Sequence, residues 1–79
     1  MLEKSSDIAN IFGKSIKELR LEKGFTQEKL AENSGLHTNY ISLLERGKRK
    51  PTINTVFKIA AALEIKPHQL IIKIEDKLR

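Results

Sequence analysis

The sequence predicts an all-α fold made of five short helices. In each candidate segment, apolar residues recur at intervals of three and four positions, which is the spacing of one helix face. Gly24, Gly35 and Gly47 separate the first segments, and no segment shows a persuasive alternation of apolar and polar residues typical of a strand. With 79 residues, the chain is expected to form a single domain over residues 8–79, after a flexible tail at residues 1–7.

The first helix is expected to begin at Asp7, with Asp7 or Ser6 as its N-cap, and to end at Gly24. Arg20 and Lys23 fall in its last turn, where positive side chains interact favourably with the helix dipole. One apolar stripe predicts the buried side of this helix, and it consists of Ile8, Ile11, Phe12, Ile16 and Leu19.

Residues 26–46 predict two short helices joined by a tight turn. The first of them is expected to run from about Gln27 to Ser34, with the Thr26 hydroxyl capping its free backbone N–H groups. Gly35 tolerates the positive φ that such a turn needs. The second is expected to run from about Thr38 to Arg46.

The second helix of this pair sorts its residues onto two sides, at about 100° per residue. The apolar side holds His37, Tyr40, Ile41 and Leu44, and the other side holds Thr38, Asn39, Ser42, Leu43 and Arg46. Amides, hydroxyls and aliphatic side chains recognise base edges, because Asn bonds adenine at two positions and Leu contacts the thymine methyl. We therefore expect base contacts from Thr38, Asn39, Ser42 and Leu43. Asn39 is the strongest candidate, whereas Leu43 equally suits packing.

These residues resemble the helix-turn-helix of the Cro/C1-type (Xre) repressor family. The matching positions are Gln27, Leu30, Ala31, Gly35, Leu36, Ile41, Leu44 and Glu45, and a looser likeness extends from about Ile11 to Ile72. Ser34 departs from the family, which often has a more apolar residue there, and so predicts a slightly wetter turn. The resemblance implies a five-helix, lambda-repressor-like DNA-binding domain. It also implies sequence-specific transcriptional regulation through the major groove of double-stranded operator DNA.

Two individual roles follow from the same resemblance. Gln27 is expected to clamp a DNA phosphate, and Arg20, late in the first helix, is expected to pair with Glu45, late in the third. If this pair is partly buried, removing one partner should cost about 3 kcal/mol, because the other charge is then left unpaired.

The positive charge is concentrated after the second helix of the motif. The net charge is +5, and residues 36–58 hold five cations against Glu45 alone, a net charge of +4. Such a cluster is typical of a polyanion-binding surface, and N–H groups at a helix start also favour anions. Phosphate contacts are therefore expected from Thr26, Gln27, His37, Tyr40, Arg46, Lys48, Arg49 and Lys50. His37 alternatively packs at the turn, and the Tyr40 ring is expected to pack while its hydroxyl bonds phosphate.

Two further helices follow, with Thr52 capping the fourth and Pro67 in the first turn of the fifth. The expected buried stripes are Ile53, Val56, Phe57, Ala60 and Leu63 on the fourth helix, and Leu70, Ile71, Ile74 and Leu78 on the fifth. Apolar residues in surplus for so small a core predict a homodimer interface at Ile65, Ile72, Ile74 and Leu78, with Ile59 in reserve. The alternative is that these residues complete the monomer core. A two-fold dimer would set its recognition helices about 34 Å apart.

Several classes of function find no support in the sequence. There is no cysteine, and His37 and His68 are far apart, so neither a metal site nor a cofactor is expected. No nucleophile–base pair or carboxylate dyad suggests an enzyme, and no small-molecule ligand is expected. The chain starts without a signal-peptide pattern and has no apolar run long enough to cross a membrane, which predicts a cytoplasmic protein.

The size of the chain and the run ISLLERGKRKP are similar to controller proteins of restriction–modification systems, which regulate their own gene and the endonuclease gene. A phage-type repressor, an antitoxin and a protein-interaction module on the same fold are the alternatives. The basic cluster favours DNA over a protein partner, because docking a protein gains little from that charge. RNA polymerase is a second candidate partner for such a regulator.

Overall fold

The computed structural model describes residues 5–78 and contains the five predicted helices, with no strand in that part of the chain. They are α1 (Ser5–Glu22), α2 (Gln27–Ser34), α3 (Thr38–Glu45), α4 (Ile53–Ala62) and α5 (Pro67–Lys77). The all-α prediction is confirmed. The first helix begins two residues before the predicted Asp7, so residues 5–7 belong to α1 and not to a tail. The rest of the predicted tail, residues 1–4, lies outside the described residues.

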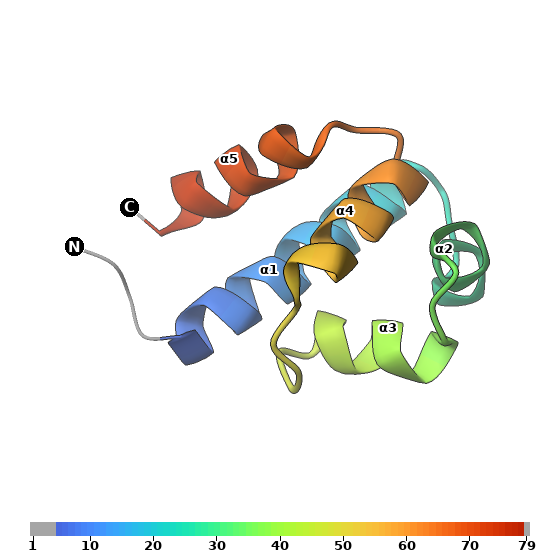
Figure 1. The fold of residues 1–79 in the computed structure, drawn as a ribbon, viewed down its shortest axis with the longest axis horizontal. Coiled ribbons are helices and arrows are strands. Elements are labelled where there is room, and N and C mark those ends of the chain that lie inside the picture. Colours follow the sequence, from blue (N-terminus) through green and yellow to red (C-terminus); the bar gives the residue numbers. More distant parts are fainter. Residues whose placement is uncertain (1–4, 79) are drawn as a thin grey trace.

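The helices surround one core (Figure 1). Helix α1 packs against α3 on one side and α5 on another, α2 packs against α3 and α4, and α4 also contacts α5. In Figure 1 α2 is seen nearly end-on while α3 lies across the view, so the two helices of the motif cross at a steep angle. The side chains that are completely or almost completely buried come from all five helices and from the residue after α4; the largest are Phe12, Ile16, Leu30, Ile41, Leu44, Ile59, Leu63 and Leu70.

Helix α3 lies directly on α1 at Gly13. A Cβ added at Gly13 would overlap the backbone oxygen of Leu44 and come within 2.7 Å of the backbone oxygen of Glu45. Since real Cβ atoms do not approach backbone this closely, only glycine permits the observed contact between α1 and the end of α3. Gly13 therefore fixes how closely α3 packs on α1.

The turn between α2 and α3 is built as predicted, with one correction. Thr26 Oγ1 accepts a hydrogen bond from the Lys29 N–H at 3.0 Å, and Gly35 has φ of 72° at the end of α2. Ser34 is buried, and its hydroxyl donates to the Ala31 carbonyl at 3.2 Å. The predicted wetter turn is wrong, because the serine hydroxyl is satisfied inside the chain instead of by water.

The predicted buried face of α4 is only partly right, because Val56, Ala60 and Leu63 are buried as expected but Ile53 and Phe57 are not. Ile53 and Phe57 are 68% and 56% exposed, whereas Ile59 is completely buried with Val56 and Ala60. The observed buried arc is rotated by about 80° from the predicted one. Helix α4 packs against both α2 and α5, and Ile59 belongs to the core that these helices share.

Two residues of the predicted dimer interface are also wrong, because both are buried. Ile59 and Ile74 are 0% and 7% exposed and belong to the monomer core, so neither is available to a partner. Ile72 is 49% exposed, and Ile65 and Leu78 are half-buried against the core. Ile71, expected on the buried stripe of α5, is 45% exposed. Within residues 5–78, no helix combines the length and the apolar character needed to cross a membrane.

Candidate nucleic-acid interface

Helix α3 is oriented as the sequence predicts. Its inner side carries Ile41 and Leu44, both 0% exposed and part of the core. Its outer face, which we define as Thr38, Asn39, Ser42 and Leu43, points away from the core, with Asn39 exposed and the other three side chains half-buried. The groups that suit base edges are therefore accessible, and the aliphatic groups anchor the helix from behind.

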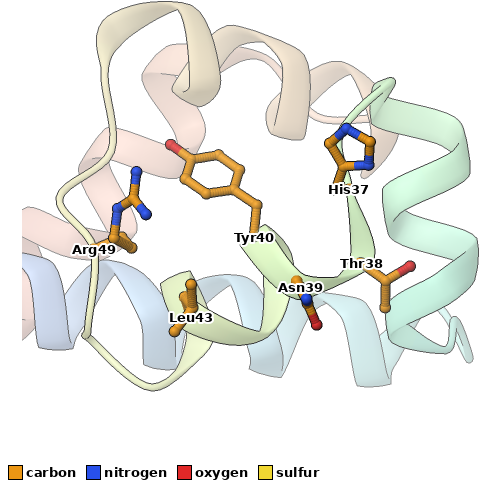
Figure 2. A pocket seen from close by; sticks show the side chains of 6 residues that line it. All are labelled: His37, Thr38, Asn39, Tyr40, Leu43 and Arg49. Atoms are coloured by element: carbon orange, nitrogen blue, oxygen red, sulfur yellow. The ribbon is translucent and has the colours of Figure 1, made fainter.

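A surface pocket lies over this outer face (Figure 2). It is lined by His37, Thr38, Asn39, Tyr40, Leu43 and Arg49. Figure 2 shows Arg49 and His37 at opposite ends of the pocket, with the Tyr40 ring between them and Asn39 along the helix. The pocket thus places an amide, a hydroxyl, an aliphatic group and a cation side by side, a mixture suited to base edges and phosphates.

Tyr40 has protein partners on both its hydroxyl and its ring. Its Oη atom is 3.1 Å from Thr55 Oγ1 on α4, and either atom can donate the hydrogen. The guanidinium carbon of Arg49 lies 5.6 Å from the centroid of the ring, within the range of a cation–π interaction. Thr55 is thus one partner of the Tyr40 hydroxyl, which is both a donor and an acceptor, and the phosphate bond of this hydroxyl stays a prediction.

Four cations follow α3 directly: Arg46, Lys48, Arg49 and Lys50, in what we call the basic segment (residues 46–50). All four side chains are exposed. Gly47 has φ of 72°, and a Cβ there would overlap the side chain of Asn10 on α1. The N–H of Lys48 donates to the Leu43 carbonyl at 2.9 Å, so the segment is tied back onto α3. Its positive charges are thereby held next to the outer face.

The expected ion pair between Arg20 and Glu45 is present behind α3. Arg20 Nε donates to Glu45 Oε2 at 2.7 Å and Nη2 donates to Oε1 at 3.0 Å, a two-pronged arrangement with side-chain exposures of 9% and 3%. Arg20 Nη1 also donates to the Phe25 carbonyl at 2.8 Å. The hydrogen bonds with Glu45 raise the pKa of the Arg20 guanidinium, against an opposing effect of burial. The pair therefore ties the end of α3 to α1.

The start of α2 holds the other two predicted phosphate contacts. Thr26 uses its hydroxyl as the N-cap of α2. Gln27 Nε2 donates to Glu45 Oε1 at 3.0 Å, which joins Gln27 to the buried ion pair. The second hydrogen of that amide, and the backbone N–H groups of Gln27 and Glu28 in the first turn of α2, suit a phosphate oxygen.

The residue types in the sequence predicted no metal site, and the structure adds one observation. Among residues 5–78 there is no group of three or more His, Cys, Asp or Glu side chains placed to hold a metal ion. His37 is exposed at the start of α3, makes no capping bond with its side chain and lines the pocket. His68 is exposed on α5.

A short helix seated by its apolar side, with its polar side open beside a basic segment, defines the helix-turn-helix class of DNA-binding domains. Comparison with known proteins agrees with this class. The helix-turn-helix family model matches residues 16–70, and the chain belongs to this family of transcriptional regulators.

Three similar proteins illustrate the family. The chain is 37% identical to the uncharacterised HTH-type transcriptional regulator y4dJ of Sinorhizobium fredii, over 89% of this chain and 91% of that protein. It is 38% identical to the control protein C.BamHI of Bacillus amyloliquefaciens, over 85% and 84% of the two chains. The restriction–modification controller protein C.Esp1396I, solved as a tetramer with its natural 35 base-pair operator, superposes with a TM-score of 0.84 at 35% identity, over 90% and 93% of the chains.

Sequence reasoning missed three contributors to this surface. Thr55, Gly13 and Asn10 touch Tyr40, the end of α3 and Gly47, respectively. The glycine inside an apolar helical stripe was a signal that could have been used, because an interior glycine often marks close approach of another backbone. Nothing in the sequence around Thr55 indicates that its hydroxyl reaches a tyrosine fifteen residues away.

Proposed function

We propose that the chain binds inverted-repeat operators as a homodimer and acts as the autoregulatory controller of a restriction–modification operon. The observation that carries DNA binding is the outer face of α3, with Asn39 exposed beside the basic segment. Cytoplasmic location follows from this function, because the operator DNA is there.

The controller subclass is supported by the relatives. C.BamHI and C.Esp1396I carry that function in their names, and each is covered over more than four fifths of its length. C.Esp1396I was solved as a tetramer in complex with its natural 35 base-pair operator, so that protein binds its operator as an oligomer. A chain of this size, with a single short recognition helix, gains sequence specificity in the same way. A phage-type repressor or an antitoxin remains the second candidate, because the same fold serves regulators of other names, such as SinR.

Residue roles follow the geometry of the pocket. We assign base contacts to Thr38, Asn39, Ser42 and Leu43. Phosphate contacts are assigned to the start of α2 and to the cations and His37 around the pocket; these residues are Thr26, Gln27, His37, Arg46, Lys48, Arg49 and Lys50. Each cation removed should weaken binding to all sequences and reduce the salt slope by about one unit.

The proposed dimer surface lies on the opposite helices. We define the α4–α5 face as Ile53, Phe57, Ile71 and Ile72, all large apolar side chains between 45% and 68% exposed. Ile53 and Ile71 also line an apolar groove with Leu78, Val56 and other residues of α1, α4 and α5. A second copy of the chain is the proposed occupant, because a small core beside a large exposed apolar surface gains stability from self-association.

Selection of bound duplexes from a random-sequence pool, followed by gel-shift titration at two salt concentrations, tests the proposal. We expect two inverted half-sites and an affinity that falls steeply with salt. Asn39→Ala should lose about 1–3 kcal/mol on the selected site only. Asn33→Ala, an exposed asparagine on α2 outside the pocket, is the matched control. Absence of binding at low salt would exclude DNA binding and favour a protein-interaction module.

A further inference from the structure

A buried residue of α4 makes direct contact with the recognition helix. Thr55 is 5% exposed, and its Oγ1 atom is 3.1 Å from the hydroxyl of Tyr40 on α3. The Tyr40 ring in turn carries the Arg49 guanidinium at 5.6 Å from its centroid. One continuous set of contacts therefore runs from Thr55 on the buried side of α4, through the Tyr40 ring, to Arg49 of the basic segment. Figure 2 shows the part of this set formed by Tyr40 and Arg49.

The hydroxyl groups in this set satisfy one another. Thr52 Oγ1 accepts from the backbone N–H of Thr55 at 3.1 Å and donates its own hydrogen to Thr55 Oγ1 at 3.1 Å. A threonine hydroxyl offers one hydrogen and two lone pairs, so Thr55 keeps one hydrogen and one lone pair. Tyr40 is the partner that uses one of them. Removing the Thr55 hydroxyl would leave both Thr52 and Tyr40 without this partner in a partly buried site.

Arg49 needs such support more than the pocket residues of α3 do. It lies in the exposed basic segment, outside any helix, and its long side chain loses considerable rotamer freedom when it is fixed. Stacking on Tyr40 holds its cation at one end of the pocket that also contains Asn39 and Leu43. A cation that is already in place when DNA arrives costs less to order on binding.

We propose that Thr55 is a positioning residue for DNA recognition. Its hydroxyl fixes the orientation of Tyr40, and the Tyr40 ring fixes Arg49 at the end of the pocket. Thr55 itself touches no DNA. This role rests on the proposed DNA-binding function, but the arrangement of Tyr40 and Arg49 can be tested without DNA.

The first measurement is NMR of the free protein, following the ring-current shift of the Arg49 side-chain protons. Tyr40 is the only tyrosine and the chain has no tryptophan, so the signals of this ring are assigned easily. We expect shifted Arg49 signals in the wild type, and displacement towards unstructured values in Thr55→Val and Tyr40→Leu. Thr55→Ser, which keeps the hydroxyl, should stay close to wild type. Unchanged Arg49 signals in Thr55→Val would overturn the proposal.

The second measurement is gel-shift titration on a random-sequence 20 base-pair duplex at several salt concentrations. Arg49→Gln should reduce the salt slope by about one unit. Thr55→Val should weaken binding about three- to tenfold and reduce the slope in the same direction. In the Arg49→Gln background it should have no further effect. A purely structural role of Thr55 would instead lower affinity equally in both backgrounds, with an unchanged slope, and would contradict the proposal.

Tyr40→Phe supplies an independent route to the same answer. It keeps the ring but removes the bond to Thr55, so it should match Thr55→Val, and the double variant should be no weaker than either single one. Thermal unfolding without DNA checks that each variant is folded; if Thr55→Val is not, Tyr40→Phe carries the test. Should wild type fail to bind the duplex, the proposed function fails as well. Should wild type bind while Tyr40→Phe keeps full affinity and slope, only the positioning role fails.

Discussion

The outer face of α3 and the α4–α5 face are the two accessible surfaces with a distinct chemistry, and they differ in how the sequence encodes them. On α3, Ile41 and Leu44 fall on the inner side, and the outer face is polar except for Leu43. On α4, seven of ten residues are apolar, so several different arcs satisfy the pattern of a buried stripe. The direction in which a helix faces can be derived from its sequence only when its apolar residues leave one side free.

The two surfaces also differ in the contacts that attach their helices to the rest of the protein. The end of α3 is tied to α1 by the charges of Arg20 and Glu45 and by the contact at Gly13. The buried side of α4 is almost entirely aliphatic, and its polar exception, Thr55, bonds to Thr52 and Tyr40. The recognition surface is therefore held by directional contacts, and the α4 part of the proposed dimer surface mainly by non-directional packing.

The largest effect is expected from breaking the ion pair behind α3. Glu45→Ala leaves the buried Arg20 guanidinium and the Gln27 amide without their carboxylate, and should lower the free energy of unfolding by about 3–5 kcal/mol. Urea unfolding followed by circular dichroism measures this loss. The control is the double variant Arg20→Met, Glu45→Leu, which should be near neutral, since no charge is left unpaired. A loss below 1 kcal/mol in the single variant would mean that packing alone seats α3.

The second effect concerns association. Phe57→Ser removes a side chain that is 56% exposed, so the free energy of unfolding of the monomer should change by less than about 0.5 kcal/mol. Dimer dissociation, measured by analytical ultracentrifugation, should rise at least about tenfold, because an aromatic group at the centre of an interface contributes strongly. Leu21→Ser is the matched control, since Leu21 is 58% exposed on α1 and is not one of the residues of the α4–α5 face. Equal effects of both variants on dimer dissociation would contradict the assignment of the α4–α5 face as the dimer interface.

The sequence was sufficient for the features that depend on local chemistry. Helix boundaries followed from Thr26, Gly35 and Thr52, whose capping bonds or backbone angles act within a few residues. The orientation of α3 followed from its own residues. The exposure of Ile53 and the burial of Ile59 did not, because they depend on how α2 and α5 pack around α4.

In the candidate site too, local features could be predicted from the sequence and contacts between distant residues could not. Asn39, Leu43 and the basic segment could be placed from helical spacing and charge. The contact of Tyr40 with Thr55 joins residues that are far apart in the chain, and no periodic pattern encodes it. Resemblance to a family supplied the pairing of Arg20 with Glu45, which residue spacing alone would not have given.

The third effect compares the ends of α3 and α4. Both are followed by a residue with positive φ, Gly47 at 72° after α3 and Glu64 at 62° after α4. Because a side chain in this conformation costs about 1 kcal/mol, Glu64→Gly should stabilise the protein by about 0.5–1 kcal/mol in thermal unfolding. It loses only an exposed ion pair with Lys23. The matched control is Gly24→Ala after α1, where φ is 74° and an added Cβ would contact no atom. This variant should lower the stability by a similar amount. Destabilisation by Glu64→Gly would mean that the Lys23 contact outweighs the backbone cost.

The smallest effect is electrostatic and concerns how α5, and with it half of the α4–α5 face, is attached to α1. Glu18 Oε2 lies 3.1 Å from Lys77 Nζ and Oε1 lies 3.3 Å from Lys73 Nζ, and these partners, Lys77 first, lower the pKa of Glu18 below its ordinary 4.5. A carboxyl whose pKa is lower in the folded state stabilises the fold above the ordinary pKa, and this contribution is lost as pH falls through the lowered value. Glu18→Gln should therefore unfold at a slightly lower temperature than wild type at pH 6, and the two should converge below the lowered pKa. Added salt should shrink the difference at pH 6, because all three side chains are partly exposed. A difference that persists unchanged in acid would show that it does not come from the charge of Glu18. No difference at pH 6 would show that these ion pairs do not attach α5, which would extend the contrast with the ion-paired α3 to the whole α4–α5 face.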